Sequence, residues 1–396
     1  MILCEIINVA LYLMALWLYW RKYASFDTYF VLMSAFAFTA IMSACFQASG
    51  DSPYNKTTIF PYIYFFVCIC ICFKPYAGFH LDKKLNINET ILIKLLMWVY
   101  IIIGALAFYY TLPNAMVLLQ SGEWGDLRDQ LYQGDNIELY SSQTERLVKN
   151  IFSYLSPFGI VMAFYQLTKT NRKWYIVFLL FGTWLGNTFL GATLVASRGI
   201  VAILLLRIGL ILILFKESIP HKVKKRFLYM LFFLSIPAAL YLISVSVSRF
   251  GEDEAGDSIF YYLGHAMQNF NENCMMAMYD FAWGQYALSY FAGIFGWHPL
   301  NRESLGYSGG TGFYSFLGSF YIDFGPIGTF VFCLILCWLI SNYTKTDKKT
   351  FSDLIVIVYF ASFFMNGVFV IGSGYALQWI MVWIVYRIVK FSEKSI

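Results

Sequence analysis

The residues best suited to chemistry in this sequence are arginines near the ends of long apolar stretches. Arg198 precedes one such stretch and Arg249 follows the next, while Arg128 lies in a polar segment nearer the N-terminus. Arginine keeps its charge and presents a planar fork that matches phosphate oxygens. We therefore expect these residues to bind the phosphate groups of an anionic substrate at a membrane boundary. The alternative is that each one extends to lipid headgroups without a part in catalysis.

A further arginine, Arg207, lies inside an apolar stretch, nine residues after Arg198. At about 100° per residue the two side chains point to opposite faces of a helix, so they are not expected to serve one phosphate. An arginine at membrane depth is costly and is therefore a functional candidate. Pairing with a buried carboxylate would explain it equally well.

Acid–base catalysis would come from His265 or His298, because imidazole titrates near neutral pH. Each could equally be an ordinary core or surface histidine. The carboxylates that compete for this role are Glu272, Asp280, Glu303 and Asp323. Asp323 has a structural alternative as well, since it could cap a helix that has Pro326 in its first turn.

Metal ligands are not predicted by any cluster of side chains in the polar segments. Cys68, Cys70 and Cys72 alternate along one apolar stretch, and residues two apart on a helix diverge by roughly 200°. They therefore do not converge on one ion. We expect a chemistry that uses neither a metal nor a cofactor.

These residues must be positioned by a membrane protein. The 396 residues are 59% hydrophobic and only 13% charged, whereas soluble domains carry about 25% charged residues. Because about 20 apolar residues span a bilayer as a helix, we predict an all-α polytopic fold with about 11 transmembrane helices in one domain, residues 1–396. The expected spans are roughly 2–20, 28–48, 58–73, 91–112, 151–168, 174–192, 199–215, 227–248, 325–342, 351–366 and 368–388.

The distribution of charge predicts the orientation of these spans. Most of the 28 lysines and arginines lie in short segments between spans, and such segments stay in the cytoplasm. We therefore predict an N-terminus outside, a cytoplasmic C-terminus and two large outer segments, about 113–150 and 249–324. Residues 281–297 are apolar enough to resemble a span, but a crossing there would invert the later charges. We expect an interfacial or re-entrant helix there, or a loop helix packed on the bundle.

The most specific motif runs from Gly309 to Gly328 and contains Gly-Thr-Gly-Phe-Tyr followed by Phe-Tyr-Ile-Asp-Phe-Gly-Pro-Ile-Gly. It resembles the signature of the Wzy-type bacterial oligosaccharide repeat-unit polymerases, which make O-antigen and capsular polysaccharide. Ala-Ser-Arg-Gly at 196–199 is similar to the arginine at the same architectural position in that family. The chain length, the span count and the large outer segment after the eighth span resemble the family too. In sequence, the resemblance covers only a small part of the chain.

This resemblance implies a fold related to the C-type membrane glycosyltransferases and a location in the bacterial cytoplasmic membrane. The implied reaction transfers a growing glycan from an undecaprenyl-diphosphate carrier to a newly delivered lipid-linked repeat unit on the outer face. Arg198 and Arg249 would stabilise the leaving diphosphate, with Arg128 approaching from the first large segment. His265, His298 or a carboxylate would deprotonate the acceptor hydroxyl. The aromatic residues expected to stack on sugar rings are Tyr314, Tyr321 and Trp297.

The partners implied are undecaprenyl-diphosphate-linked oligosaccharides, the lipid bilayer, a chain-length regulator and a flippase, whereas no nucleic acid is expected. Two enzymatic or transport alternatives remain open. An O-antigen ligase is disfavoured because His298 is followed by Pro299 and Arg302, which do not complete an outer His-x-x-x-Gly motif. A lipid-linked oligosaccharide flippase or other transporter would place polar residues along a midplane path, a role open to Lys94 and Arg207. A non-catalytic assembly partner is a third possibility.

Overall fold

The computed structural model describes residues 1–50, 52–83, 85, 87–121, 142–254, 257–307, 313–346 and 348–394, without the side chains of 121, 249–254 and 257–261. Over these ranges the chain is helical, and β-structure is limited to an isolated bridge between Ser315 and Val370. Eight helices in this part of the chain are long and apolar enough to cross a membrane. These are the features of a polytopic membrane protein, as the sequence predicts.

A helix overlaps each of the eleven expected spans. The eight that qualify by length and composition include α1, α2, α3, α4, α6, α7, α9 and α12, whereas α8, α13 and α14 do not. The number of eleven crossings therefore stays a prediction. The bounds are α1 (Ile2–Tyr23), α2 (Thr28–Ser49), α3 (Ile59–Phe73), α4 (Ile91–Ser121), α6 (Gln143–Thr168), α7 (Trp174–Leu194), α8 (Arg198–Leu214), α9 (His221–Glu254), α12 (Ser315–Thr344), α13 (Phe351–Asn366) and α14 (Tyr375–Lys394).

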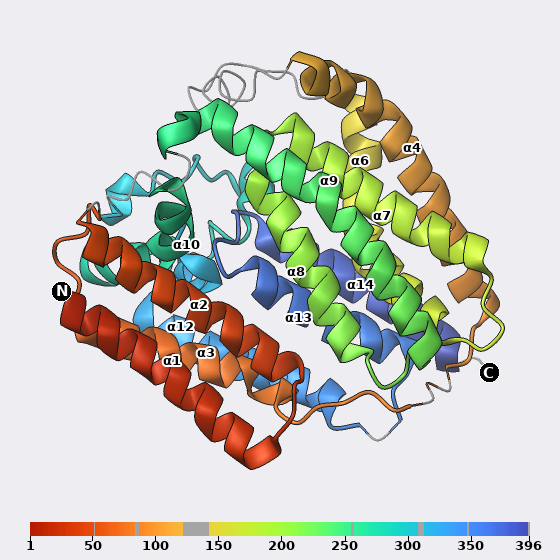
Figure 1. Ribbon diagram of the computed structural model, residues 1–396, viewed down its shortest axis with the longest axis horizontal. Helices are drawn as coiled ribbons and strands as arrows, with labels where there is room; N and C mark the ends of the chain where they lie inside the picture. Colours follow the sequence, from red (N-terminus) through yellow and green to blue (C-terminus); the bar gives the residue numbers. More distant parts are fainter. Residues whose placement is uncertain are drawn as a thin grey trace. The chain divides into compact units, whose positions relative to one another are not determined.

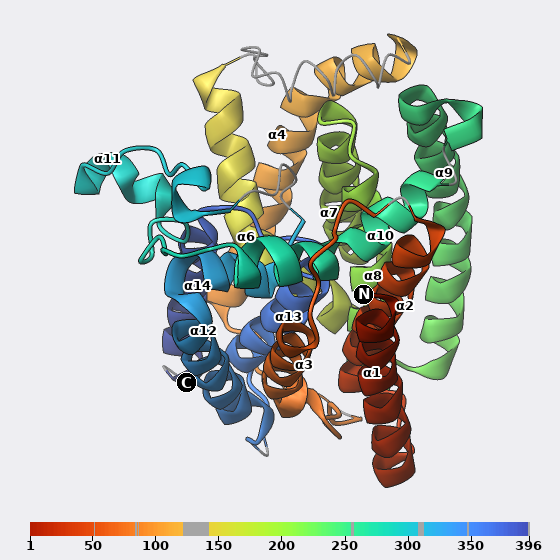
Figure 2. The same ribbon diagram turned by 90° about the vertical axis from the view of Figure 1, so that its left-hand side faces the viewer.

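The chain divides into two compact units, and the first contains residues 1–79, 256–347 and 360–380. In it, α1, α2 and α3 lie side by side (Figure 1). Their interface is partly polar: the fully buried Glu5 accepts hydrogen bonds from the hydroxyls of Tyr62 and Ser43. The helix α10 (Asp257–Asn269) packs on α2 (Figure 2). The two helices approach so closely at Gly264 that a Cβ there would lie 2.6 Å from the carbonyl oxygen of Met42. A glycine is therefore needed at this position.

The second unit contains residues 80–255, 348–359 and 381–396. Figure 1 shows α7 running beside α4 and α8 beside α9, and each pair is in contact. The side-chain amide of Asn187 on α7 donates to the carbonyl of Gly104 on α4 at 2.8 Å. The hydroxyl of Tyr241 on α9 donates to the carbonyl of Ala192 on α7 at 3.0 Å. Each bond satisfies a polar group inside an apolar bundle, where it would otherwise be costly.

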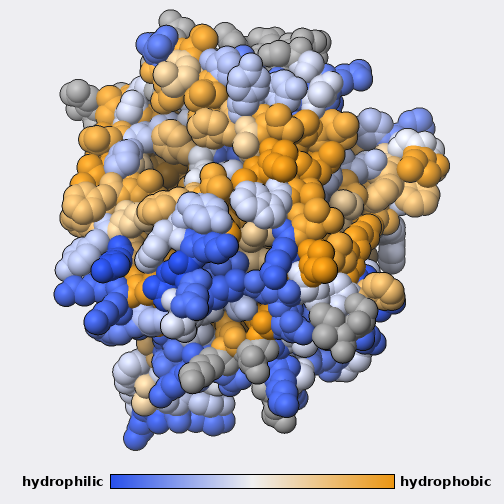
Figure 3. Space-filling view, turned by 90° about the vertical axis from the view of Figure 1, so that its right-hand side faces the viewer, coloured by the Kyte–Doolittle hydropathy of each residue, from blue (hydrophilic) through white to orange (hydrophobic). Residues whose placement is uncertain are grey.

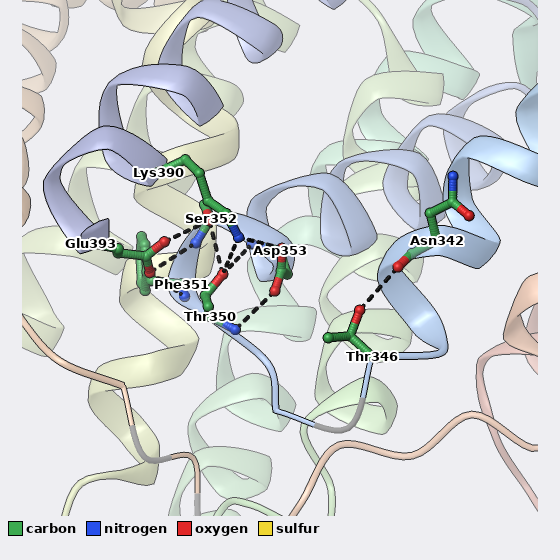
Figure 4. Close-up of polar contacts among 8 residues, drawn as sticks. All are labelled: Asn342, Thr346, Thr350, Phe351, Ser352, Asp353, Lys390 and Glu393. Atoms are coloured by element: carbon green, nitrogen blue, oxygen red, sulfur yellow. Dashed lines mark hydrogen bonds and ion pairs between the residues drawn. The ribbon is translucent and has the colours of Figure 1, made fainter.

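The start of α13 is fixed by a small polar cluster in the second unit (Figure 4). Thr350 and Asp353 form a reciprocal capping box, because each side chain accepts a hydrogen bond from the backbone N–H of the other. The Glu393 carboxylate, on α14, accepts hydrogen bonds from the backbone N–H groups of Phe351 and Ser352. Lys390 lies 3.4 Å from Asp353. Charged and hydroxyl side chains thus satisfy the free N–H groups of the first turn.

The helix α12 is broken at Gly325, which has φ 63° and ψ −170°. Pro326 follows and has no N–H to donate to the carbonyl of Ile322, one turn earlier. That carbonyl instead accepts a bond from the backbone N–H of Ala282 at 2.7 Å, and the next carbonyl, of Asp323, accepts one from Trp283 at 2.9 Å. The break therefore fastens the loop at 282–283 to the first half of α12.

The outer surfaces of many helices are apolar. Apolar side chains cover much of the face drawn in Figure 3, and hydrophilic side chains gather in one area of it. Large apolar side chains are widely exposed in both units, among them Ile327 at 80% and Phe233 at 68%. Soluble monomers rarely expose apolar surface on this scale, so contact with lipid is the natural explanation.

The apolar segment 281–297 forms turns and two short helices rather than one interfacial or re-entrant helix. These are the 3₁₀ helix η3 (Ser289–Phe291) and the four-residue α11 (Ala292–Phe295). Gly284 and Gly296 have positive φ angles of 92° and 66°, and Trp283 has a φ of 51°. These left-handed residues interrupt the helix that the apolar composition favours.

Candidate functional site

A half-buried arginine, Arg302, lies among tyrosines in the first unit. Its guanidinium carbon is 5.1 Å from the centre of the Tyr307 ring and 6.0 Å from that of Tyr314. Within the described residues Arg302 makes no ion pair, and its side chain donates to the hydroxyl of Tyr314, 3.4 Å from Nη1. Burial opposes the charge of this guanidinium, but the surrounding tyrosines outweigh it and raise the pKa of Arg302. Several N–H donors of this charged group therefore have no acceptor among the described residues.

A chain of hydroxyl groups leads away from Arg302. The hydroxyls of Tyr314 and Tyr286 lie 2.6 Å apart, and Tyr286 donates to the carbonyl of Ile371 at 3.3 Å. Burial raises the pKa of both tyrosines, so both carry their protons at neutral pH. Arg302 can thus donate to Tyr314, Tyr314 to Tyr286 and Tyr286 to a carbonyl. The tyrosines hold one edge of the guanidinium and leave the rest of its donors for a ligand.

The backbone that carries Arg302 is anchored at its other end. The 3₁₀ helix η4 (Glu303–Leu305) follows Arg302 and ends at Gly306, whose φ is 88°. A Cβ on Gly306 would lie 2.7 Å from the carbonyl oxygen of Ala277. The backbone N–H of Tyr279 donates to the carbonyl of Leu305 at 3.2 Å. This segment is therefore attached to the residues just after η2 (Phe270–Met276), a π-helical turn that continues α10.

Asp323 is fully buried in the first half of α12 and organises the turn that carries Tyr286. One carboxylate oxygen accepts a hydrogen bond from the backbone N–H of Tyr286 at 2.9 Å. The other accepts bonds from the N–H of Ala287 at 2.9 Å and from the hydroxyl of Tyr375 at 3.1 Å. One interpretation of the sequence is that Asp323 caps the helix that begins at Pro326. This interpretation is wrong, because the Asp323 carboxylate accepts its hydrogen bonds from Tyr286, Ala287 and Tyr375. Its two oxygens already have donors, which is the arrangement of a structural carboxylate.

An apolar groove of about 550 Å³ lies between α3, η2 and the kink of α12. The hydroxyl of Tyr64 at its wall donates to the carbonyl of Pro326, in the kink, at 2.5 Å. Thioethers and rings make up most of the remaining lining, from Phe60, Pro61, Met275, Met276, Tyr321, Ile327 and Phe330, with Thr58 as its polar member. The groove can hold a flexible hydrocarbon chain. The elements η2 and α12 are both near Arg302 in the chain's connections, because η2 ends just before the residues that anchor η4 and α12 begins one residue after Tyr314.

Exposed aromatic rings surround the turns of the first unit. Tyr279, Trp283 and Tyr290 are 75%, 74% and 67% exposed. Trp283 also has a left-handed backbone conformation that is costly for a residue with a side chain. The hydrogen bond from the backbone N–H of Trp283 to the carbonyl of Asp323 on α12 compensates for part of that cost. Rings held this way can stack on the apolar face of a sugar.

The aromatic residues that the sequence suggests for stacking on sugars are less exposed than these rings. Tyr314 and Tyr321 are buried, and Tyr321 packs edge-on against Phe270 and Phe281. Trp297 is partly buried against Phe295. Tyr314 and Tyr321 thus support the site from inside, and neither offers a ring face to a sugar in this conformation.

Arg198 is the first residue of α8 in the second unit. Its Nη1 donates to the hydroxyl of Ser246 on α9 at 2.7 Å. Ser246 lies three residues before Arg249, so the beginning of α8 packs beside the part of α9 that leads to Arg249. The side chain of Arg249 and the whole of Arg128 lie outside the described residues.

The two candidate histidines differ in environment. His265 is buried in α10, where the hydroxyl of Tyr54 lies 2.9 Å from its ring nitrogens. Burial lowers the pKa of His265 to about 4, so it is neutral at pH 7 and a weak base. His298 is exposed beside Trp297. The structure does not bring either histidine to the guanidinium of Arg302 by a described contact.

Arg302, Tyr279, Trp283 and Tyr290 are the potential functional residues that the sequence does not single out. Arg302 lies in a loop with no motif around it, and its neighbours Tyr307 and Tyr314 are five and twelve residues away. The available signal is its position shortly before the glycine-rich motif at 309–328. In the part of the chain that the structure describes, no three His, Cys, Asp or Glu side chains gather as metal ligands.

Comparison with known proteins finds no matching family model, no similar curated protein and no similar solved structure.

Proposed function

We propose that this protein is a polysaccharide polymerase that joins undecaprenyl-diphosphate-linked repeat units at the outer face of the cytoplasmic membrane. The observation that carries the proposal is Arg302, a charged guanidinium held by tyrosines next to the glycine-rich motif, without an acidic partner among the described residues. Such a group binds an anionic oxygen and strengthens its hold as charge develops on a leaving diphosphate.

Two further features match the parts of a lipid-linked glycan. The apolar groove beside η2 and α12 would take part of the polyprenyl chain, because its lining is almost wholly apolar and the adjoining Ile327 is exposed. The exposed rings of Tyr279, Trp283 and Tyr290 would stack on sugars. Arg198, at the start of α8, is a separate candidate for binding phosphate within the second unit.

The proposed reaction is a glycosyl transfer without a metal. The acceptor hydroxyl oxygen attacks the anomeric carbon of the donor sugar, and the bond to the diphosphate oxygen breaks with its electron pair leaving on the diphosphate. Arg302 stabilises that charge. We assign the base to Glu303, which is exposed and adjacent to Arg302 in the chain, rather than to Asp323, whose oxygens are occupied. Glu303 takes the proton of the acceptor hydroxyl.

The proposal predicts that Arg302→Ala removes polymerisation in cells. In a strain lacking the protein, wild type should restore a ladder of surface glycan, and Arg302→Ala at matched membrane abundance should lower polymer by about 100-fold, as expected for loss of a donor to a developing charge. Arg302→Lys should restore it only in part, because it keeps the charge but not the fork. Arg198→Ala should also be defective. Glycan length is measured on gels.

The matched control is Arg146→Ala, which removes an exposed arginine from the first turn of α6 and should leave the ladder unchanged. A full ladder with Arg302→Ala would overturn the proposal.

A flippase is the second candidate, and Arg207 is the observation that favours it. Arg207 lies within α8 over the ring of Trp184, 5.8 Å from its centre, and its buried Nε has no acceptor among the described residues. A cation inside a helical bundle is typical of a transport path. Accumulation of lipid-linked repeats on the cytoplasmic side of the null strain would support this function instead.

A further inference from the structure

A buried amide, Asn269, connects the two chain segments that hold Arg302. Asn269 is fully buried at the end of α10, where the π-helical turn η2 begins. Its Nδ2 donates to the hydroxyl of Tyr307 at 3.0 Å and to the carbonyl of Phe313 at 2.6 Å. Its Oδ1 accepts a bond from the amide of Asn273 at 2.8 Å. All three contacts fix the direction in which the amide points.

These contacts lie directly behind the candidate anion site. Tyr307 has its ring 5.1 Å from the guanidinium carbon of Arg302, and Phe313 precedes Tyr314, whose hydroxyl accepts from Arg302. Asn269 thus bonds to Tyr307, directly before the segment 308–312, and to Phe313, directly after it. Both tyrosines that contact Arg302 are therefore located by one side chain.

The local helix geometry brings the second amide into place. In η2 the hydrogen bonds span five residues instead of four, which widens the turn. Asn273 lies in this turn, is 8% exposed and turns its amide to Asn269. π-Helical turns in proteins often coincide with functional sites. Here Asn273, in the π-helical turn, supports the fully buried side chain of Asn269.

We propose that Asn269 is a positioning residue for the anion site of Arg302, and that the ligand it serves is a diphosphate. This inference rests on the proposed function. Asn269 does not contact the ligand; it holds Tyr307 and the chain before Tyr314 so that the free edge of the guanidinium faces the diphosphate oxygens. Asn269→Asp keeps the size and the acceptor oxygen but loses the N–H donors, so both tyrosine segments lose their common attachment.

The test measures binding and turnover separately in the full-length protein reconstituted in nanodiscs. Farnesyl diphosphate is the binding probe, and a synthetic lipid-linked repeat unit is the substrate. Asn269→Asp should weaken probe binding and raise KM by about tenfold, the equivalent of about one buried hydrogen bond, with a smaller change in kcat. Tyr307→Phe removes one of the two acceptors and should give a smaller effect in the same direction.

The matched control is Asn187→Asp, the same substitution at a buried amide of α7 in the second unit. The Nδ2 of Asn187 donates to the carbonyls of Gly104 and Thr183, both at 2.8 Å. Asn187→Asp should lower the melting temperature without changing KM. If Asn269→Asp changes only the melting temperature, or if its KM equals that of Asn187→Asp, the inference is overturned.

The outcomes also separate this inference from the proposed function. Suppose that wild type binds farnesyl diphosphate but forms no polymer, and that Asn269→Asp weakens this binding. The positioning role of Asn269 then stands, and the proposed polymerase function fails. If polymer forms but Asn269→Asp binds and reacts like wild type, the polymerase stands and the positioning role fails. If wild type does not bind the probe, the inference is overturned.

Discussion

At the residue scale, Arg302 and Asp323 show how differently two charged groups are used. Asp323 is fully buried and accepts three hydrogen bonds, two of which come from backbone N–H groups of the turn at 286–287. Its carboxylate therefore stabilises this turn. Arg302 has one described acceptor, an uncharged tyrosine hydroxyl. Buried charges are normally paired, and a half-buried arginine with no acidic partner in the described part of the chain is suited to an anionic ligand.

His265 provides a prediction about pH. Burial lowers its pKa to about 4 from the usual 6.5, so between these values the unfolded chain binds a proton that the folded chain does not. Stability that is present above pH 6.5 is therefore lost as the pH falls towards 4. At pH 5 the loss is about 2 kcal/mol. His265→Gln should show a smaller drop in melting temperature between pH 7 and pH 5 than wild type.

The control for this prediction is His298→Gln, since His298 is exposed and should leave the wild-type pH dependence unchanged. Equal pH dependences for wild type and His265→Gln would show that burial of this imidazole is not what acid disrupts.

Residue types alone could not identify this site. Arg198 and Asp323 stand beside recognisable patterns, whereas Arg302 gains its meaning from Tyr307, Tyr314 and Tyr286, which the turns of residues 277–307 bring together. Hydrogen-bond partners decide whether Asp323 is a base, a cap or a support, and no spacing rule contains them. The same is true of His265, whose neutrality comes from burial.

At the scale of elements, the break in α12 connects the glycine-rich motif to the aromatic turns. Gly325 needs a positive φ, and a Cβ there would lie 2.6 Å from the ring of Phe281. Gly325→Ala should therefore destabilise the protein by about 1–3 kcal/mol. Differential scanning fluorimetry in detergent should show a lower melting temperature and, because the turn at 282–287 loosens, reduced activity.

The control is Gly182→Ala, at an exposed helical glycine of α7 with nothing within 4 Å of an added Cβ. This change should be neutral or stabilising by up to about 1 kcal/mol. A melting temperature of Gly325→Ala equal to that of Gly182→Ala would contradict the account of the break.

The elements themselves follow closely from apolar pattern and helix signals. The stretch 351–366 is predicted as a span and forms α13 with the same ends, because Thr350 and Asp353 cap it. Pro326 likewise marks the start of the second half of α12. The segment 281–297 fails the same logic, since its left-handed residues, Trp283 among them, depend on bonds to distant carbonyls.

At the scale of the whole molecule, the division into two units could not be predicted from the sequence. Both units are assembled from separated stretches, and the boundary passes through α13 and α14, where neither composition nor a linker marks it. The described helices fit a polytopic membrane protein, while the orientation of the termini remains a prediction from charge. Cations proposed for diphosphate binding occur in each unit, Arg302 in the first and Arg198 in the second.

Proteoliposomes that contain only the purified protein and a synthetic undecaprenyl-diphosphate-linked repeat unit would test the proposed polymerase without any other protein present. Wild type should convert single repeats into longer lipid-linked glycans, resolved by gel or mass spectrometry, and Arg302→Ala should leave them as single repeats. A wild type that leaves single repeats unchanged, or an Arg302→Ala variant that extends them as well as wild type, would show that the protein is not a polymerase that depends on Arg302.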